Sequence, residues 1–309
     1  MSVTRFIIKG SFFGSLVLFA FLCSCENKNA NKVEIVEFLT VVDDLGRIVK
    51  VKKNANRFLP LAPSVTEMLY LVCDAKKIVG RTPNCNFPSA LLAKPIVNNY
   101  PPDLERILFL HPDLVITKDG MLSLSQAEAI EKMGVPVYFQ KYNSVEDIFV
   151  GITKLGELTG NKEIGKIKAD SLRLIISKNI KLVGEGKKKK VLLLISKERY
   201  FSFGKNSYAS DILAISGAVN AVDSIYDSSY PVLSSEYILK INPDIIIGGE
   251  QVGLENDFFE WHKELKRTNA YKNGQCFTIN DDYLSRPGPR VVEAINIVRS
   301  IVNGSYLKP

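Results

Sequence analysis

The sequence Glu105-Arg-Ile-Leu-Phe-Leu-His-Pro-Asp-Leu-Val-Ile116 recurs 131 residues later as Glu236-Tyr-Ile-Leu-Lys-Ile-Asn-Pro-Asp-Ile-Ile-Ile247, with six of twelve positions identical. Each copy predicts a short amphipathic helix, a turn at a proline and an apolar β-strand. A helix–turn–strand unit repeated at this distance indicates two similar α/β lobes and a cleft between them. The repeated glutamates then occupy equivalent places, one in each lobe.

Strand and helix signals alternate around the repeat, which predicts mostly parallel sheets. Ser64 is the expected N-cap of an early helix, and Glu67 completes a capping box three residues later. Ser144 and Asp147 make a similar cap. The other predicted elements are a hairpin over 41–51, strands at 57–62, 78–80, 135–139 and 191–195, and helices at 127–133, 144–158 and 291–302. Residues 211–214 are expected to continue the α/β pattern.

A long helix is expected between the two copies of the repeat. Residues 162–182 contain no proline and one glycine, and their isoleucines and leucines recur near helical spacing. A helix of this length spans about 30 Å, the width of a small domain. The chain of 309 residues is long enough for two domains. We therefore predict an N-terminal α/β lobe at 26–160, an interlobe helix at 161–186 and a C-terminal α/β lobe at 187–309.

Residues 1–25 are typical of a secretory leader. Arg5 and Lys9 precede an apolar stretch that is too short for a comfortable membrane-spanning helix. The stretch ends in Leu22-Cys23-Ser24-Cys25, which resembles a bacterial lipobox, and predicts Cys25 as the lipidated residue. The alternative is an ordinary signal peptide with two incidental cysteines. We expect a soluble, monomeric body anchored by lipid in the cell envelope, on the periplasmic side or at the cell surface.

Composition excludes several classes of function. Only two histidines occur, so a multi-histidine metal site is excluded, and Cys73, Cys85 and Cys276 do not have metal-ligand spacing. These three cysteines leave open whether any disulfide forms. The net charge of +7 comes from basic residues spread along the chain, and export argues against a nucleic-acid partner. No GxSxG, Walker, GxGxxG or HExxH motif occurs, so no catalytic residues are predicted.

Aromatic and polar residues fall instead at predicted loops after strands, where open α/β sheets bind ligands. Aromatic rings and arginines together suit a bulky ligand with polar arms. The predicted ligand-binding residues are Asn84, Phe87, Tyr100, Phe201, Tyr230, Asp282, Tyr283 and Arg286. Arg286 and Arg290 flank a rigid Pro-Gly-Pro turn, and one of them is expected to face the cleft while the other braces the turn.

The chain resembles the helical-backbone class of periplasmic binding proteins, the capture subunits of ABC importers for cobalamin, haem and ferric siderophores. The residues that carry the resemblance are Val42–Arg47, Leu61–Glu67, Val79-Gly80, Leu104–Ile116, Glu236–Ile247 and Arg286–Arg290. Within the class the chain is most similar to the cobalamin-binding branch, through the loop Gly80–Pro88, Tyr230-Pro231, the loop Phe201–Lys205 and Asp282-Tyr283.

The resemblance implies a non-enzymatic protein with two Rossmann-like lobes joined by one long helix. It implies cobalamin or a related corrinoid as ligand, without a resident cofactor, and a permease dimer that Glu105 and Glu236 contact, one per half. The chain departs from the branch at Asn99-Tyr100, where a tryptophan is common, and at Asn86, where an acid is usual. Haem and ferric siderophores of the same class therefore stay open as ligands. A non-transport surface lipoprotein and an exported hydrolase are the competing functions outside the class.

Overall fold

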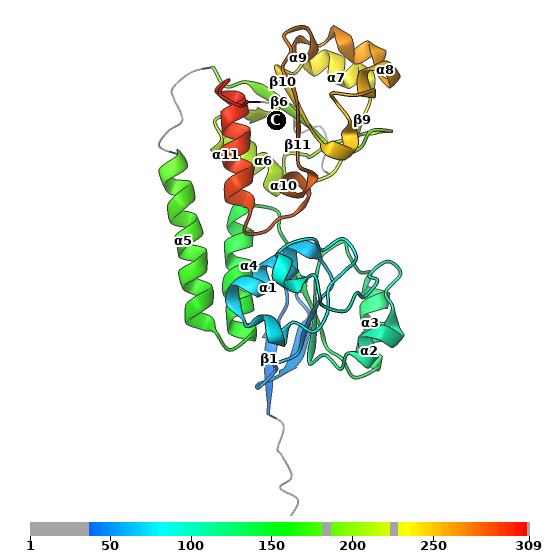
Figure 1. Cartoon of the computed structure of the whole chain (residues 1–309), viewed down its shortest axis with the longest axis vertical. Helices are drawn as coiled ribbons and strands as arrows, with labels where there is room; N and C mark the ends of the chain where they lie inside the picture. The colour runs from blue at the N-terminus through cyan, green and yellow to red at the C-terminus, as the bar shows by residue number, and fades with distance from the viewer. Residues whose placement is uncertain (1–36, 181–186, 223–227, 308–309) are drawn as a thin grey trace, which may run out of the picture. The chain divides into compact units, whose positions relative to one another are not determined.

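The computed structural model describes residues 37–180, 187–222 and 228–307, which fold into two α/β lobes (Figure 1). The leader, the lipobox with Cys25 and the last part of the predicted interlobe helix, 181–186, lie outside the described residues. Within the described residues, no helix is both long and apolar enough to cross a membrane.

The repeated phrase forms the same unit twice, as predicted. Helix α2 (Leu104–Phe109) leads into strand β4 (Leu114–Lys118), and helix α7 (Ser235–Ile241) leads into strand β10 (Ile245–Gly249). The likeness extends to backbone angles. His111 and Asn242, the residues before the prolines, both adopt the left-handed conformation, with φ of 42° and 41°. Such a residue reverses the chain at a helix end, which allows each helix to fold back along its strand.

The aspartate of each repeat joins its strand to the neighbouring strand. Asp113 donates its N–H to the carbonyl of Arg57 (2.8 Å), and its carboxylate accepts the N–H of Arg57 (3.1 Å). Asp244 makes the same two contacts with Lys190, at 2.9 and 2.8 Å. Arg57 and Lys190 stand at the beginnings of strands β3 (Phe58–Pro60) and β6 (Lys190–Leu194). The paired contacts therefore fix the register of one parallel strand pair in each lobe, β3–β4 and β6–β10.

The main sheet of each lobe is parallel, and the two main sheets have matching strand orders. The N-terminal sheet has the order β3-β4-β5, and the C-terminal sheet has the order β11-β10-β6-β8. The N-terminal lobe also contains β1 (Phe38–Val42), β2 (Ile48–Lys52), α1 (Pro63–Val72), α3 (Leu124–Lys132), β5 (Val137–Gln140) and α4 (Val145–Leu158), with short 3₁₀ turns at Ala75–Lys77 and Ser89–Leu91.

The C-terminal lobe follows the long helix α5 (Lys162–Ile180). Its remaining elements are β7 (Tyr200–Phe201), α6 (Tyr208–Ile215), β8 (Val219–Asn220), β9 (Val232–Leu233), α8 (Phe258–Trp261), α9 (Asn269–Lys272), β11 (Cys276–Ile279), α10 (Asp281–Ser285) and α11 (Val291–Val302), with 3₁₀ turns at Glu250–Val252 and Lys263–Arg267. These observations confirm an α/β fold with two parallel-sheet lobes. The residue limits of the predicted domains stay predictions.

Two local predictions are wrong. Helix α1 is not capped by Ser64 and Glu67, because the helix begins two residues earlier than predicted, with Ala62 as N-cap and Pro63 in the first turn. Glu67 is buried and points away from the helix end toward Arg290. The predicted strand at 78–80 is reduced to a single bridge between Ile78 and Phe58.

Helices α4 and α5 form a close antiparallel pair (Figure 1). The predicted capping box of Ser144 and Asp147 begins α4. Gly156 and Gly165 face each other, and a Cβ on Gly156 would lie 2.8 Å from the Cα of Gly165. Neither position can accept a side chain without separating the helices.

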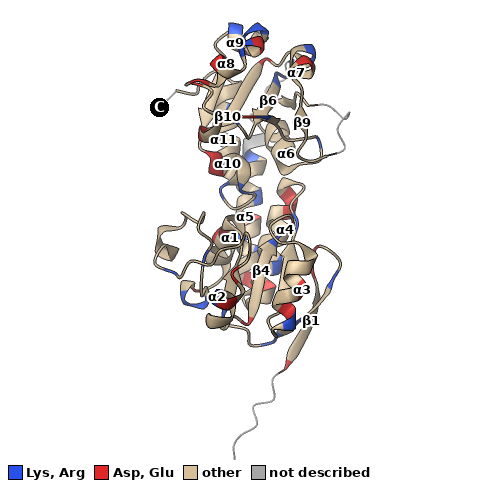
Figure 2. Cartoon of the chain, turned by 90° about the vertical axis from the view of Figure 1, so that its right-hand side faces the viewer, with Lys and Arg blue, Asp and Glu red and all other residues tan. Residues whose placement is uncertain are grey.

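One continuous hydrophobic core runs through both lobes. Its buried residues include Met68 of α1 and Ile152 of α4 from the first lobe, and Ile212 of α6 and Val298 of α11 from the second. Ala169 and Ile176 of α5 belong to the same core. The lobes are therefore joined by packed helices as well as by the chain that connects them. Acidic and basic residues are interspersed along the backbone of both lobes (Figure 2).

The Asp113 contacts give a test of the strand pairing. We expect Asp113→Asn to lower the free energy of unfolding by about 1–2 kcal/mol, because an amide cannot accept the backbone N–H groups and the Lys52 ammonium as well as a carboxylate does. Chemical denaturation at neutral pH measures the loss. Asp170→Asn, on the exposed face of α5, is the matched control and should change little.

The same variant should respond to pH. Burial opposes ionisation of Asp113, but the hydrogen bonds from Asn56, Lys52 and Arg57 outweigh it and lower its pKa. The stabilisation is therefore complete above the ordinary carboxyl pKa of about 4 and is lost as the pH falls through the lower folded-state pKa. The wild-type advantage over Asp113→Asn should shrink at pH 3, and an advantage that persisted there would contradict this assignment.

Candidate functional site

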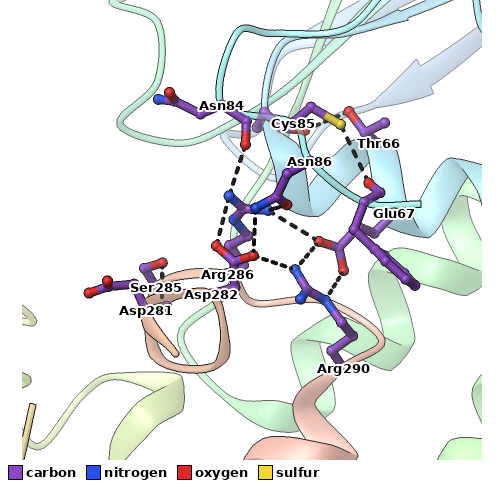
Figure 3. A network of polar contacts seen from close by, with 12 residues as sticks. Thr66, Glu67, Asn84, Cys85, Asn86, Asp281, Asp282, Ser285, Arg286 and Arg290 are labelled. Carbon is purple, nitrogen blue, oxygen red and sulfur yellow. Dashed lines mark hydrogen bonds and ion pairs between the residues drawn. The ribbon is translucent and has the colours of Figure 1, made fainter. Parts of the chain in front are cut away.

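A network of charged and amide side chains connects the two lobes (Figure 3). Glu67 of α1 and the loop residues Asn84 and Asn86 come from the N-terminal lobe. Asp282 of α10 and two arginines near the start of α11 come from the C-terminal lobe. We call these residues, Glu67, Asn84, Asn86, Asp282, Arg286 and Arg290, the interlobe network.

Glu67 and Arg290 form its most buried contact. The guanidinium of Arg290 binds both carboxylate oxygens of Glu67, with Nε at 2.9 Å and Nη2 at 2.6 Å. Glu67 is 2% exposed, so this ion pair is largely removed from water. Nη2 of Arg290 also lies 3.2 Å from Asp282. A bidentate, desolvated pair of this kind is geometrically specific, and it holds α1 against the start of α11.

Arg286 forms the second part of the network. Its guanidinium lies 2.7 Å from Asp282, donates to the side-chain oxygen of Asn86 at 2.6 Å and donates to the carbonyl of Asn84 at 2.8 Å. The amide of Asn86 completes the ring by donating to Asp282 at 3.1 Å. Both arginines thus contact the opposite lobe, whereas the sequence predicts that one of them only braces its own turn.

Two aromatic residues lie beside these charges. Phe87 stacks on the guanidinium of Arg290, with 4.9 Å between the ring centroid and Cζ, and Tyr283 lies 5.8 Å from the same group. Phe87 is 44% exposed and leaves part of its ring accessible to a ligand. The structure therefore brings together five of the residues predicted to bind ligand: Asn84, Phe87, Asp282, Tyr283 and Arg286.

The other three predicted ligand residues lie elsewhere. Tyr230 packs on Phe203, with 5.7 Å between ring centroids, and burial together with the nearby Asp119 carboxylate raises its pKa. Because Asp119 follows β4, Tyr230 faces the N-terminal lobe. Phe201 is half-buried in the small strand pair β7–β9, and Tyr100 is 82% exposed. Within the described ranges, no hydrogen bond, ion pair or ring contact joins these three residues to the interlobe network.

A pocket of about 360 Å³ lies on the side of the network that faces α5. Tyr70 of α1, Leu172 of α5 and Glu293 of α11 line it together with Phe87 and Arg290. Phe87 is the member of the predicted ligand set that reaches it. This volume falls at the lower end of small-molecule sites, so the pocket does not correspond to the large ligand site that the aromatic loops predict.

Glu105 and Glu236 occupy the same position in their helices. Each is the second residue of its helix, after an N-cap, Asp103 or Ser234, whose side chain accepts a backbone N–H. Both glutamates are exposed, and neither forms an ion pair with any residue that the structure describes. Hydrogen bonds from its own N–H and from Ser234 lower the pKa of Glu236. The protein therefore presents one accessible carboxylate on each lobe.

Sequence reasoning does not find the role of Glu67, because the local pattern assigns it to a helix cap. Asn86 lies in the loop Gly80–Pro88 that carries the resemblance, but it is not selected as a ligand contact. Nothing local marks Glu67 as the partner of Arg290, 223 residues away.

The described cysteines form no disulfide. Burial raises the pKa of Cys85, whose thiol lies 3.4 Å from the carbonyl of Phe87. No cluster of metal-ligating side chains occurs among the described residues.

Comparison with known proteins gives a family match. The family model described as periplasmic binding protein matches residues 60–283. An uncharacterised ABC transporter substrate-binding lipoprotein of Bacillus subtilis, YvrC, is 26% identical over 282 residues, which cover 87% of each chain. The vitamin B12-binding protein of Vibrio cholerae is 25% identical over 79% of this chain and 88% of its own length.

Solved structures share the fold. A possible iron-binding periplasmic solute-binding protein from Staphylococcus epidermidis superposes with a TM-score of 0.71 and 27% identity, over 81% of this chain and 99% of the other. A periplasmic haem-binding protein from Pseudomonas aeruginosa superposes with a TM-score of 0.73 and 19% identity, over 82% and 94% of the two chains. The second likeness shows the fold alone.

The buried ion pair gives a test of how the lobes are held. We expect Glu67→Gln to lower the free energy of unfolding by about 3 kcal/mol, because it leaves the Arg290 charge without its main partner. Replacing both residues, Glu67→Met with Arg290→Met, should recover part of this loss, since no unpaired charge remains. Denaturant titration measures both effects.

Lys53→Met is the control for this test. It removes an exposed ion pair, that of Lys53 with Glu37, and should leave the midpoint unchanged. If Glu67→Gln behaved like the exposed control, the pair would not hold the lobes together.

Proposed function

This chain belongs to the periplasmic binding protein family, and we propose that it is the substrate-binding protein of an ABC importer, with cobalamin or a related corrinoid as its ligand. Family membership confirms that it is a binding protein and not an enzyme. The observation that carries the ligand proposal is the likeness to a vitamin B12-binding protein over 88% of that protein's length. The aromatic side chains of Phe87 and Tyr230 support it, since both are partly exposed.

The proposed binding site lies between the lobes, at the carboxyl ends of the two sheets. The loop after Gly80, the residues after β4 and the loop that begins α10 all leave the sheets at this edge. Asn84, Phe87, Tyr283 and Arg286 would contact the ligand around the interlobe network, and Tyr100, Phe201 and Tyr230 would contact it from the neighbouring loops. A corrin ring offers a large apolar face to such aromatics and amide arms to the polar groups.

A second candidate ligand is haem or a ferric siderophore. The likeness to a possible iron-binding protein, at 27% identity, favours it. Tyr100 and the partly exposed Tyr230 carry phenols that could bind ferric iron directly. The charge of Arg286, however, is already neutralised by Asp282 and gives an anionic siderophore little to bind.

We propose that Glu105 and Glu236 contact the permease when the protein delivers its ligand. Their equivalent helix positions, exposure and lack of an ion pair in the described structure suit contact with two equivalent basic pockets, one in each half of a permease dimer. Cys25 is proposed as the lipid attachment site, which would hold the protein at the cell envelope facing away from the cytoplasm. A relative that is named a lipoprotein supports this assignment.

The ligand proposal is tested by titrating the purified protein with cyanocobalamin, hemin and a ferric siderophore, with tryptophan and tyrosine fluorescence or calorimetry as the readout. We expect saturable binding of cyanocobalamin at micromolar concentration or below, with no turnover. Tighter binding of hemin or the siderophore would replace the corrinoid by the second candidate. Binding of none of them would remove the support for either ligand class.

The docking proposal predicts a separation between capture and delivery. Glu105→Ala together with Glu236→Ala should leave ligand affinity unchanged and reduce uptake into permease-containing vesicles by about tenfold or more, because charge pairs at an interface govern association. Glu128→Ala, an exposed glutamate of α3, is the matched control. Normal uptake by the double variant would contradict the docking role.

A further inference from the structure

Lys118 is a cation at the predicted ligand edge that forms no ion pair among the described residues. It is the last residue of β4, the central strand of the N-terminal sheet. The backbone around it is fixed, because Asp119 donates its N–H to the carbonyl of Gln140 at 2.7 Å and Met121 donates to the carbonyl of Lys118 at 3.0 Å. Its position is therefore set by the sheet and not by a free loop.

The ammonium of Lys118 is partly buried and has no partner in the part of the chain that the structure describes. Across those ranges its side chain makes no hydrogen bond and no ion pair, whereas the ammonium of Lys154, which is also half-buried, lies 2.5 Å from Asp44. The register of the parallel strands places Lys118 beside Gln140, whose side chain is already bonded to the carbonyl of Gly151 and to Tyr142. Gln140 therefore uses its side chain within its own lobe, and it forms no hydrogen bond with Lys118 in the described structure.

The surroundings of Lys118 belong to the interlobe edge. The adjacent Asp119 is close enough to Tyr230 of the other lobe for its carboxylate to raise the pKa of that phenol, after the larger effect of burial. Burial also lowers the pKa of Lys118, and the Asp119 carboxylate only partly opposes this effect. A partly desolvated ammonium without a paired anion destabilises a protein by itself, and an anionic group of a bound ligand would offset this cost.

We propose that Lys118 binds an anionic group of the ligand, a carboxylate or a phosphodiester, in the site between the lobes. The inference rests on the proposed binding function and adds that the ligand carries a negative charge at the end of β4. Because the charges of Asp282 and Arg286 cancel each other, Lys118 is then a specificity-determining cation of the site.

The test compares Lys118→Met with wild type in the full chain. The probes are cyanocobalamin, which carries a phosphodiester, dicyanocobinamide, which lacks it, and hemin, which carries two carboxylates. Lys118→Met should weaken binding of the anion-bearing ligand by about tenfold or more, because a hydrogen bond to a charged group is lost. Its affinity for dicyanocobinamide should not change, because that ligand lacks the phosphodiester. Loss with cyanocobalamin identifies a phosphodiester partner, and loss with hemin identifies a carboxylate.

Two controls keep the outcome specific. Lys118→Arg keeps the charge and should retain most of the affinity, whereas Lys141→Met, an exposed lysine just after β5, should change nothing. Equal affinities of wild type and Lys118→Met for the anion-bearing ligand would overturn the proposal, and so would an equal loss with dicyanocobinamide.

A second measurement separates this proposal from the proposed function. In the ligand-free protein, Lys118→Met should be at least as stable as wild type, because it removes an unpaired, partly buried charge. A lower midpoint of thermal unfolding would give Lys118 a structural role and overturn the inference. If wild type bound none of the three probes, the proposed ligands would fail, and the Lys118 inference would be decided by this comparison of stability.

Discussion

The shared hydrophobic core is the constraint on which the rest of this structure depends. Side chains of α1, α4, α5, α6 and α11 pack into one cluster that belongs to neither lobe alone. Burial of this apolar surface fixes α1 against α11, and so brings the Glu67 carboxylate within reach of Arg290. The polar network could not exist if the lobes were joined only by a linker, since each of its ion pairs needs partners held at a fixed separation.

The elements that could be predicted from sequence are those whose causes are local. The repeat around Pro112 and Pro243 contains its own helix, turn and strand signals, and the box of Ser144 and Asp147 lies within a few residues. Glu67 shows the limit of such signals. Its spacing from Ser64 satisfies the pattern of a capping box, but Pro63 begins the helix earlier, and a charge on the opposite lobe determines where the carboxylate points.

The sequence predicts which loops form the site better than it predicts which residues contact one another there. The sequence predicts that Phe87 and Tyr283 face a ligand, and the structure places both on the guanidinium of Arg290. It predicts Arg286 and Asp282 as separate ligand contacts, yet they pair with each other. Lys118 gives no signal of its own, because a lysine at a strand end is ordinary in sequence. Lys118 points to a ligand contact only once the structure shows that the side chain of its neighbour Gln140 is bonded to other residues.

The left-handed residues His111 and Asn242 have a consequence for how the protein can vary. Each lies at the joint between a helix with an exposed glutamate and the central strand of its sheet, so its backbone angle sets the direction in which that glutamate points. A β-branched residue at either joint would strain this conformation and swing one carboxylate relative to the other. The distance between the Glu105 and Glu236 carboxylates is thus fixed by the two backbone conformations. A substitution that altered one of them would be tolerated only with a compensating substitution at the other.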